Sequence, residues 1–367
     1  MIYYIVTPKY EHTMRNYLAH WAPELQPRIK IVLYNDVLRA RELPLGTYIF
    51  SDLERLLPVE TEIATHVWDQ LHAAGARLLN HPTRTLRRYE LLSMLYAKGR
   101  NQFRVARATD KNADITFPAF LREEQEHSGS LTKLLQNRHE LDEALVGAMF
   151  RSHHLETMIV IEYCHTADAN GVFRKYSSFM VGGRVVPCHV DCSRGWMVKD
   201  TDIVDEAVMA EELDYVRTNP HREWLEETFR LAGVDYGRID YGFKNGQPQV
   251  WEINTNPVVI LTPDHYEAIH LPVKRAFAAA IAPAYIEADS VRDSGRMVPI
   301  THDPGLLRRF DEELRRQARY KARRRFMHKL VRLRAVKEVR KVIRPLLTPV
   351  APLLARVGRG RASRRTS

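Results

Sequence analysis

Residues 238–257 read R-I-D-Y-G-F-K-N-G-Q-P-Q-V-W-E-I-N-T-N-P, which is the pattern of a β-hairpin with one polar face. Apolar and polar side chains alternate before and after a polar turn, as in two half-buried strands. Arg238 and Asp240 share one face of the first strand. Glu252 and Asn254 share one face of the second. The alternation therefore predicts two antiparallel strands, each with a polar side.

The register of the hairpin decides whether these polar side chains meet. If the pairing is centred on Gly246, Asp240 faces Glu252, and the arginine and asparagine two residues further out face each other. A two-residue turn that begins at Asn245 would instead put the two carboxylates on opposite faces. Their convergence therefore requires a longer loop or a bulge, and Pro248 is compatible with such an irregularity because it cannot donate to the ladder.

Two carboxylates that face each other across a ladder repel, so a bound cation is the simplest reason for the arrangement. Oxygen ligands of this kind suit Mg²⁺ or Mn²⁺ rather than Zn²⁺, and Mg²⁺ usually shares its shell with substrate phosphates. We therefore predict Asp240, Glu252 and Asn254 as metal ligands. The alternative is a surface hairpin with solvated charges, for which the ending N-T-N-P is unusual.

R-I-D-Y, an acidic residue twelve positions after the aspartate, and E-I-N-T-N-P resemble the metal-binding end of the ATP-grasp enzymes. This is the fold of D-alanine:D-alanine ligase, glutathione synthetase and related carboxylate-amine ligases. The resemblance covers about residues 80–286. It implies that the three oxygen ligands hold one or two Mg²⁺ (or Mn²⁺) ions on the phosphates of ATP. Arg238 would be catalytic, steadying the transferring phosphoryl group or the tetrahedral intermediate.

The resemblance also implies a nucleotide site made from several further segments. In M-I-V-I-E-Y-C at 158–164, the acidic residue and the next two backbone groups would contact adenine, and Asp168 would reach the ribose. Arg122 takes the place of the family's phosphate-binding lysine, and H-S-G-S at 127–130 resembles the loop that closes over the phosphates. An arginine keeps the charge and can hold phosphate oxygens in a fork. The predicted nucleotide-binding residues are Arg88, Arg122, Ser128, Gly129, Glu162, Tyr163, Cys164, Asp168 and Lys199.

The predicted fold class is α/β (α+β). Strand-like runs alternate with helical patterns in the first 80 residues, which predicts a parallel sheet. We predict an N-terminal α/β domain at 1–80, an ATP-grasp domain of two α+β lobes at 81–163 and 164–288, a linker at 289–306 and a basic helical or disordered tail at 307–367. Expected helices are 60–75, in which Ile63, Val67 and Leu71 share one face, 85–98, 131–148 and 265–286, together with 206–232, which is interrupted near residues 219–220. Expected strands are 2–6, 30–34, 47–50, 117–122 and 158–164, and a hairpin of 174–181 and 184–190 about two glycines.

Composition supports a globular protein with an unevenly distributed charge. The 367 residues are 45% hydrophobic and carry a net charge of +10. Residues 307–367 hold 21 Lys and Arg against 4 Asp and Glu, so the body before them is mildly acidic. Three cysteines without paired C-x2-C spacing indicate a reducing compartment, and we expect a cytoplasmic protein. No stretch reaches the roughly 18 apolar residues of a membrane span.

The resemblance implies an ADP-forming carbon–nitrogen ligase that joins a small-molecule or peptide carboxylate to an amine through an acyl phosphate. An ATP-grasp kinase that phosphorylates a small molecule is one alternative. The other is a non-enzymatic protein whose basic tail binds an anionic polymer or membrane surface. The tail lacks a base-reading motif, so no specific nucleic-acid partner is predicted.

Overall fold

The computed structural model describes residues 1–126, 129–151, 153–199, 201–291 and 295–331. Its elements form two compact units, Met1–Leu91 with Thr166–Asp311, and Leu92–His165 with the chain from Glu312 onward. Each unit has its own β-sheet structure and its own cluster of buried apolar side chains. The combination of a parallel sheet with antiparallel sheets is the predicted α/β and α+β architecture.

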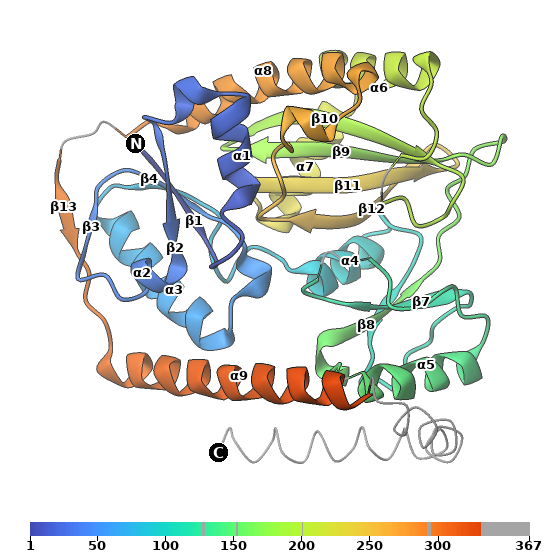
Figure 1. Cartoon of the computed structure of the whole chain (residues 1–367), viewed down its shortest axis with the longest axis horizontal. Helices are drawn as coiled ribbons and strands as arrows, with labels where there is room; N and C mark the ends of the chain where they lie inside the picture. The colour runs from blue at the N-terminus through green and yellow to red at the C-terminus, as the bar shows by residue number, and fades with distance from the viewer. Residues whose placement is uncertain (127–128, 152, 200, 292–294, 332–367) are drawn as a thin grey trace. The chain divides into compact units, whose positions relative to one another are not determined.

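The first unit begins with the predicted parallel sheet, in the order β2-β1-β4-β5 (Figure 1). Its strands are β1 (Ile2–Val6), β2 (Ile29–Leu33), β4 (Thr47–Phe50) and β5 (Arg77–Leu79). Helices α1 (His12–His20), α2 (Tyr34–Val37) and α3 (Pro58–Ala73) connect them. In α3 the predicted apolar stripe of Ile63, Val67 and Leu71 is buried. The predicted helical face therefore packs into the core.

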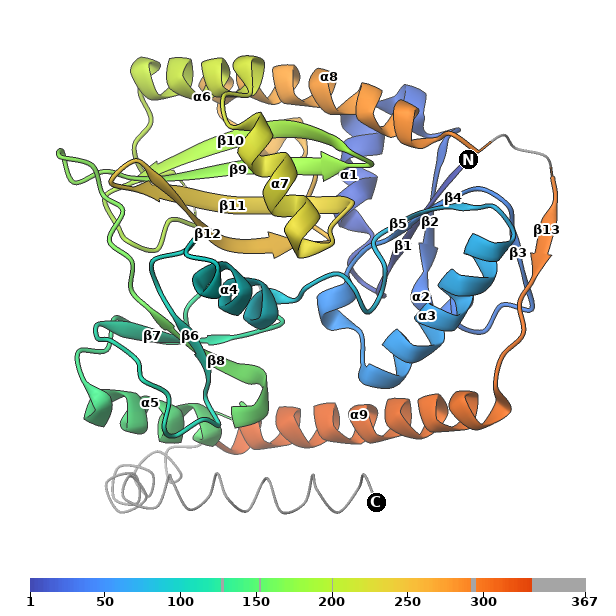
Figure 2. The same cartoon turned by 180° about the vertical axis from the view of Figure 1, so that it is seen from behind.

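The first unit also contains an antiparallel sheet in the order β10-β9-β11-β12. Its strands are β9 (Phe173–Val181), β10 (Arg184–Ser193), β11 (Tyr236–Lys244) and β12 (Gln247–Asn254). Two helices, α6 (Glu206–Thr218) and α8 (Leu271–Ala288), pack side by side against β10, and Figure 2 shows α7 (Arg222–Ala232) across one face of the sheet. The predicted β9–β10 hairpin turns at Gly182 and Gly183, both of which have positive φ.

Asn80 links the two sheets of the first unit through its buried side chain. Its Nδ2 donates to the carbonyl oxygen of Phe50 at the end of β4 and to that of Tyr236 at the start of β11, at 3.2 and 2.7 Å. Its Oδ1 accepts the backbone N–H groups of Asp235 and Tyr236, both at 2.9 Å. One amide therefore pairs backbone groups that come from both sheets.

The second unit contains an antiparallel sheet in the order β6-β8-β7, covered by its own apolar cluster. The strands are β6 (Val105–Arg107), β7 (Ala119–Glu123) and β8 (Met158–Glu162), and the helix α5 (Arg138–Phe150) packs on β7. Helix α4 (Arg88–Ala97) precedes β6, and α9 (Pro304–Val331) follows the last strand of the chain's described part. Residues 332–367 of the predicted tail lie outside the described residues.

Among the predicted boundaries, three segments differ most from the structure. The helix expected from residue 131 begins only at Arg138, because Leu135 pairs with Ala119 and the Asn137 side chain caps the helix by accepting the N–H of Glu140 at 3.0 Å. The helix expected from residue 265 begins at Leu271, after 3₁₀ turns. The segment predicted as a linker contains β13 (Met297–Pro299), which pairs with β3 (Glu42–Pro44).

Short 3₁₀ segments occur at Pro23–Leu25, Leu53–Arg55, Leu155–Thr157, Pro263–His265 and Ala268–His270. In the part of the chain that the structure describes, no helix combines the length and the apolar character that crossing a bilayer requires.

Replacing Asn80 by alanine is expected to lower the free energy of unfolding by about 3 kcal/mol or more, because buried backbone groups lose their partners and a left-handed φ of 64° passes to a residue that disfavours it. Urea unfolding of Asn80→Ala measures the loss. Asn112→Ala, at an exposed asparagine, should change stability by no more than about 0.5 kcal/mol. Equal stabilities of the two variants would contradict the linking role of Asn80.

Candidate functional site

The β11–β12 hairpin has the register that brings its polar side chains together. Arg238 pairs with Asn254, and Asp240 pairs with Glu252. The register then shifts by one residue between Asp240 and Tyr241, and the hairpin closes with a short turn. The predicted pairing is therefore confirmed, and a bulge rather than a longer loop produces it. Without the bulge the two carboxylates would point to opposite faces.

The polar pairing continues across the sheet into β9 and β10. Ser177 of β9 pairs with Asp240 on one side and with His189 of β10 on the other. With Glu252 on β12, a row of four polar residues crosses all four strands. The Ser177 hydroxyl donates to Asp240 Oδ1 at 2.9 Å. The row is the centre of the candidate site.

Asp240 lies among positive charges. Arg238 Nε donates to Asp240 Oδ1 at 3.0 Å, and Lys175 Nζ lies 4.0 Å from Oδ2. Lys175 also pairs with Asp191 at 3.0 Å. Burial opposes the charge of Lys175, but Asp240 and Asp191 hold its pKa above the ordinary value. The pKa of Arg238 is raised by the same balance of burial against Asp240, so both side chains stay protonated.

The second carboxylate of the pair, Glu252, is held by Arg88. Both side chains are buried, and Arg88 Nη2 donates to Glu252 Oε2. Arg88 was predicted only as a cationic nucleotide contact, and the structure places it against a predicted metal ligand. Each facing carboxylate is thus compensated by an arginine, which agrees with the rule that buried charges are paired.

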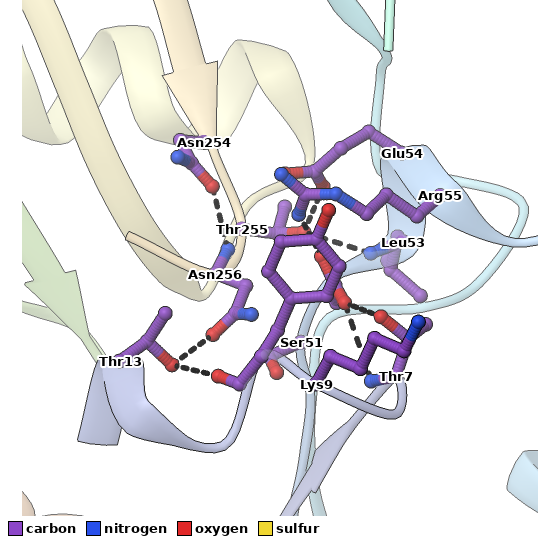
Figure 3. Close-up of polar contacts among 12 residues, drawn as sticks. Thr7, Lys9, Thr13, Ser51, Leu53, Glu54, Arg55, Asn254, Thr255 and Asn256 are labelled. Atoms are coloured by element: carbon purple, nitrogen blue, oxygen red, sulfur yellow. Dashed lines mark hydrogen bonds and ion pairs between the residues drawn. The ribbon is translucent and has the colours of Figure 1, made fainter. Parts of the chain in front are cut away.

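The chain directly after β12 is held by the loops of the first sheet (Figure 3). Asn254 Oδ1 accepts the N–H of Asn256 at 2.8 Å, which fixes the side chain of the predicted ligand. Thr255 Oγ1 accepts the N–H of Leu53 at 2.9 Å and donates to Glu54. These bonds hold the N-T-N segment in place. Sequence patterns could not reveal them because the partners lie about 200 positions apart.

Several predicted nucleotide contacts belong to the second unit. Glu162 ends β8, and its carboxylate accepts three N–H groups, from Arg104 N and Nε at 2.8 Å and from Thr116 N at 2.7 Å. The N–H of Tyr163 donates to the carbonyl oxygen of Pro118 at 2.8 Å. Cys164 is buried. The carboxylate of Glu162 therefore organises the start of β6, and its contact with adenine stays a prediction.

The predicted phosphate contacts of the second unit are Arg122 and Gly129. Arg122 is buried in β7, where it pairs with Ile159. Gly129 has a φ of 89°, a left-handed conformation that suits glycine in a loop. Ser128 lies outside the described residues. Roles on the phosphates remain predictions for all three.

The remaining two predicted contacts, Asp168 and Lys199, belong to the first unit and are solvent-accessible. Asp168 Oδ1 accepts the N–H groups of Asn170 and Val172 at 2.8 and 3.0 Å, and Oδ2 pairs with Arg174 at 2.5 Å. Its pKa is lowered, first by the Val172 N–H and then by Arg174. Lys199 is exposed in the segment after β10. The nucleotide contacts predicted for these two residues stay predictions.

The oxygen atoms of Asp240, Glu252 and Asn254 suit a divalent ion whose remaining ligands come from water or from a bound substrate. Among the described residues, no three His, Cys, Asp or Glu side chains are placed to hold a metal ion on their own. Asp240 and Glu252 offer facing carboxylates, and Asn254 adds an amide beside them. Mg²⁺ commonly binds one or two carboxylates and completes its shell with water and phosphate oxygens. The chemistry of these residues therefore suits Mg²⁺ together with a phosphorylated substrate.

No family model matches the sequence, and no curated protein matches it. Among solved structures, the chain is similar to D-alanine–D-alanine ligase from Bacillus anthracis in complex with ATP. The two are 15% identical in sequence, the match covers 78% of this chain and 98% of the other, and the TM-score is 0.43. A RimK-domain ATP-grasp protein from Sphaerobacter thermophilus is 12% identical over 77% and 99% of the chains, with a TM-score of 0.44. The ATP-grasp ligase PsnB, complexed with a precursor variant, Mg and ADP, is 10% identical over 76% and 97%, with a TM-score of 0.44. The structures that this chain resembles thus include ATP-grasp ligases.

The free energy of unfolding is expected to decrease as the pH is lowered below ~6.5, because of His189. Its side chain is partly buried, and desolvation together with the charges of Arg238, Lys274 and Lys175 holds its pKa well below 6.5, with Asp240 opposing them. Below the ordinary pKa the unfolded chain binds a proton that the folded chain does not, so stability decreases by up to about 1.4 kcal/mol per pH unit. Urea unfolding between pH 5.5 and 7.5 should show a flatter dependence for His189→Gln.

The matched variant is His139→Gln at an exposed histidine, which should leave the pH dependence of stability unchanged. An unchanged slope in His189→Gln would show that the imidazole of His189 is not the group responsible.

Proposed function

We propose that this protein is an ATP-grasp enzyme, an ATP- and Mg²⁺-dependent ligase that joins a carboxylate to an amine. The observation that supports this most directly is the pairing of Asp240 with Glu252 and of Arg238 with Asn254 on one face of a hairpin. Facing acidic side chains with a neighbouring amide and a buried arginine form a set that binds a metal–phosphate group. A solvated hairpin would not need the Arg88–Glu252 pair, which is buried.

Each residue of the set has a distinct part. Asp240, Glu252 and Asn254 would hold Mg²⁺, which when bound neutralises the phosphate charge and orients the γ-phosphoryl group. Arg238, held by Asp240 at 3.0 Å, would contact the oxygens that gain negative charge in the reaction. Ser177 fixes the orientation of the Asp240 carboxylate through the hydrogen bond to Oδ1. Arg122 and the loop with Gly129 would contribute phosphate contacts from the second unit.

The reaction proceeds by two displacements. A substrate carboxylate oxygen attacks the γ-phosphorus of ATP, the bond to the β-phosphate oxygen breaks, and ADP leaves. The amine then attacks the acyl carbon of the acyl phosphate, phosphate leaves, and the amine loses a proton. No protein nucleophile is required, so catalysis rests on positioning and electrostatics.

Isothermal titration with a non-hydrolysable ATP analogue tests the nucleotide site. The full chain should bind the analogue much more tightly with Mg²⁺ than without it. In the double variant Asp240→Asn with Glu252→Gln, the Mg²⁺-dependent part of the affinity should fall by about 100-fold, because two charged ligands are lost while the side-chain shapes are kept.

The control for this titration carries Asp214→Asn with Glu223→Gln, which removes two exposed carboxylates of the same unit and should bind like the unaltered chain. Absence of nucleotide binding in the folded full chain would overturn the proposal.

The kind of chemistry is tested by the products. With Mg²⁺, ATP and hydroxylamine as the amine, a panel of carboxylates should yield a hydroxamate and one phosphate per hydroxamate for the compounds that are substrates. Phosphate release should require both the carboxylate and hydroxylamine. Recovery of a stable phosphorylated hydroxyl compound instead would identify a kinase and contradict the ligase.

A further inference from the structure

The parallel sheet of the first unit has a position at which the direction of its connections reverses. From β1 the chain passes through α1 to β2 on one side, and β4 lies on the other side of β1. The loops that leave the carboxyl ends of β1 and β4, residues 7–10 and 51–55, therefore diverge from neighbouring strands. Open α/β sheets bind ligands at such a point, outside the carboxyl ends of the strands.

Both of these loops contain a strained residue. Lys9 has a φ of 81° and Asp52 a φ of 60°, which place two non-glycine residues in the left-handed region. Such residues cost free energy and persist at binding and active sites, where the surrounding structure holds them. Here Asp52 is fully buried and accepts from the N–H of Thr7 at 3.2 Å, from the Thr7 hydroxyl and from Arg55.

The two acidic side chains at this position, Asp52 and Glu54, both interact with Arg55. Asp52 is paired with Arg55, whose guanidinium also lies over the ring of Tyr10 at 4.0 Å. Glu54 accepts the hydroxyl of Thr255. Among the described residues, the ammonium group of Lys9, which is exposed, has neither an ion pair nor a hydrogen bond. The two loops thus carry two acids and two bases, and among these described residues the charged group without a partner is the Lys9 ammonium.

The side chain of Asn256 supplies a second group without a partner. Tyr4 and Thr13 contact its Oδ1 through their hydroxyls at 2.6 and 2.7 Å, so one end of the amide is fixed. Figure 3 shows the oxygen turned to Thr13 and the nitrogen turned away from it. Nδ2 is buried and has no hydrogen-bond partner among the described residues. An unpaired buried donor costs about 1–3 kcal/mol, which a ligand oxygen would remove.

We propose that Asn256 Nδ2 binds a carboxylate oxygen of the substrate, with the Lys9 ammonium as a positively charged contact, at the carboxyl ends of β1 and β4. Both unpartnered groups are donors and one of them is charged, which favours an anionic acceptor as the ligand. The choice of a carboxylate rests on the proposed function, since Asn256 stands two residues beyond Asn254 and is tied to it by the 2.8 Å hydrogen bond. The substrate carboxylate would then lie beside the metal-binding hairpin.

The test follows the side-chain NH₂ signals of the full chain labelled with ¹⁵N-asparagine, in the presence of Mg²⁺ and ADP. Asn256→Asp, or Asn256→Ser if the aspartate variant does not fold, identifies the Asn256 signals by their absence. Sodium acetate is the probe, and sodium chloride at equal ionic strength is its control. The Asn256 signals should shift and saturate with acetate, and remain unmoved by chloride.

Lys9→Met should raise the dissociation constant of acetate by about three- to tenfold, because one exposed positive contact is lost. Lys30→Met, at an exposed lysine of β2, is the matched control and should leave acetate binding unchanged.

Asn256 signals that do not respond to acetate would overturn the inference. A response to inorganic phosphate but not to acetate would overturn the assignment to a carboxylate.

The two proposals fail separately. Loss of Mg²⁺-dependent nucleotide binding in the titration above would overturn the proposed function. If the chain binds Mg²⁺ and nucleotide but the NH₂ signals of Asn256 do not shift with acetate, only the proposed carboxylate site is overturned.

Discussion

A one-residue bulge in the β11–β12 hairpin decides which side chains share its polar face. It shifts the register between Asp240 and Tyr241, so the carboxylates of Asp240 and Glu252 lie on the same face of the sheet. Side chains alternate with a period of two along a strand, so a single inserted residue moves every following side chain to the other face. The short turn alone would have separated the two acids. With the bulge, one face of the hairpin carries two acids, an arginine and an amide.

Electrostatic compensation keeps this face stable. Burying facing carboxylates without partners would raise the free energy of the folded state by several kcal/mol. Arg238 and Lys175 offset Asp240, and Arg88 offsets Glu252. These cations come from β9, β11 and α4, so the site depends on elements that are far apart in the chain.

The first sheet takes part in the site as well as in the fold. Its loops hold Thr255 and Asn256 through Leu53, Glu54, Tyr4 and Thr13, while Asn80 ties the end of β4 to the start of β11. The hairpin end and the loops at the carboxyl ends of β1 and β4 are thereby held as one polar group (Figure 3). The candidate site therefore combines the polar face of the hairpin with the carboxyl ends of parallel strands, where open α/β sheets commonly bind ligands.

The sequence alone determined the hairpin and the polar face of each strand, because alternation with period two is a local property of the chain. It left the register open, and the bulge seen in the structure decided that Asp240 faces Glu252. The sequence also determined the parallel sheet at the N-terminus and the buried stripe of α3. Where local patterns competed with capping and bridging contacts, as at Leu135 and Asn137, the predicted helix began too early. Tertiary structure alone decided that β9 lies beside β11, which brings Lys175 and Ser177 to Asp240. It likewise decided that Arg88 pairs with Glu252 and that Tyr4 reaches Asn256, since contacts between residues 164 and 252 positions apart follow from the packing of sheets and helices and leave no periodic signal in the sequence.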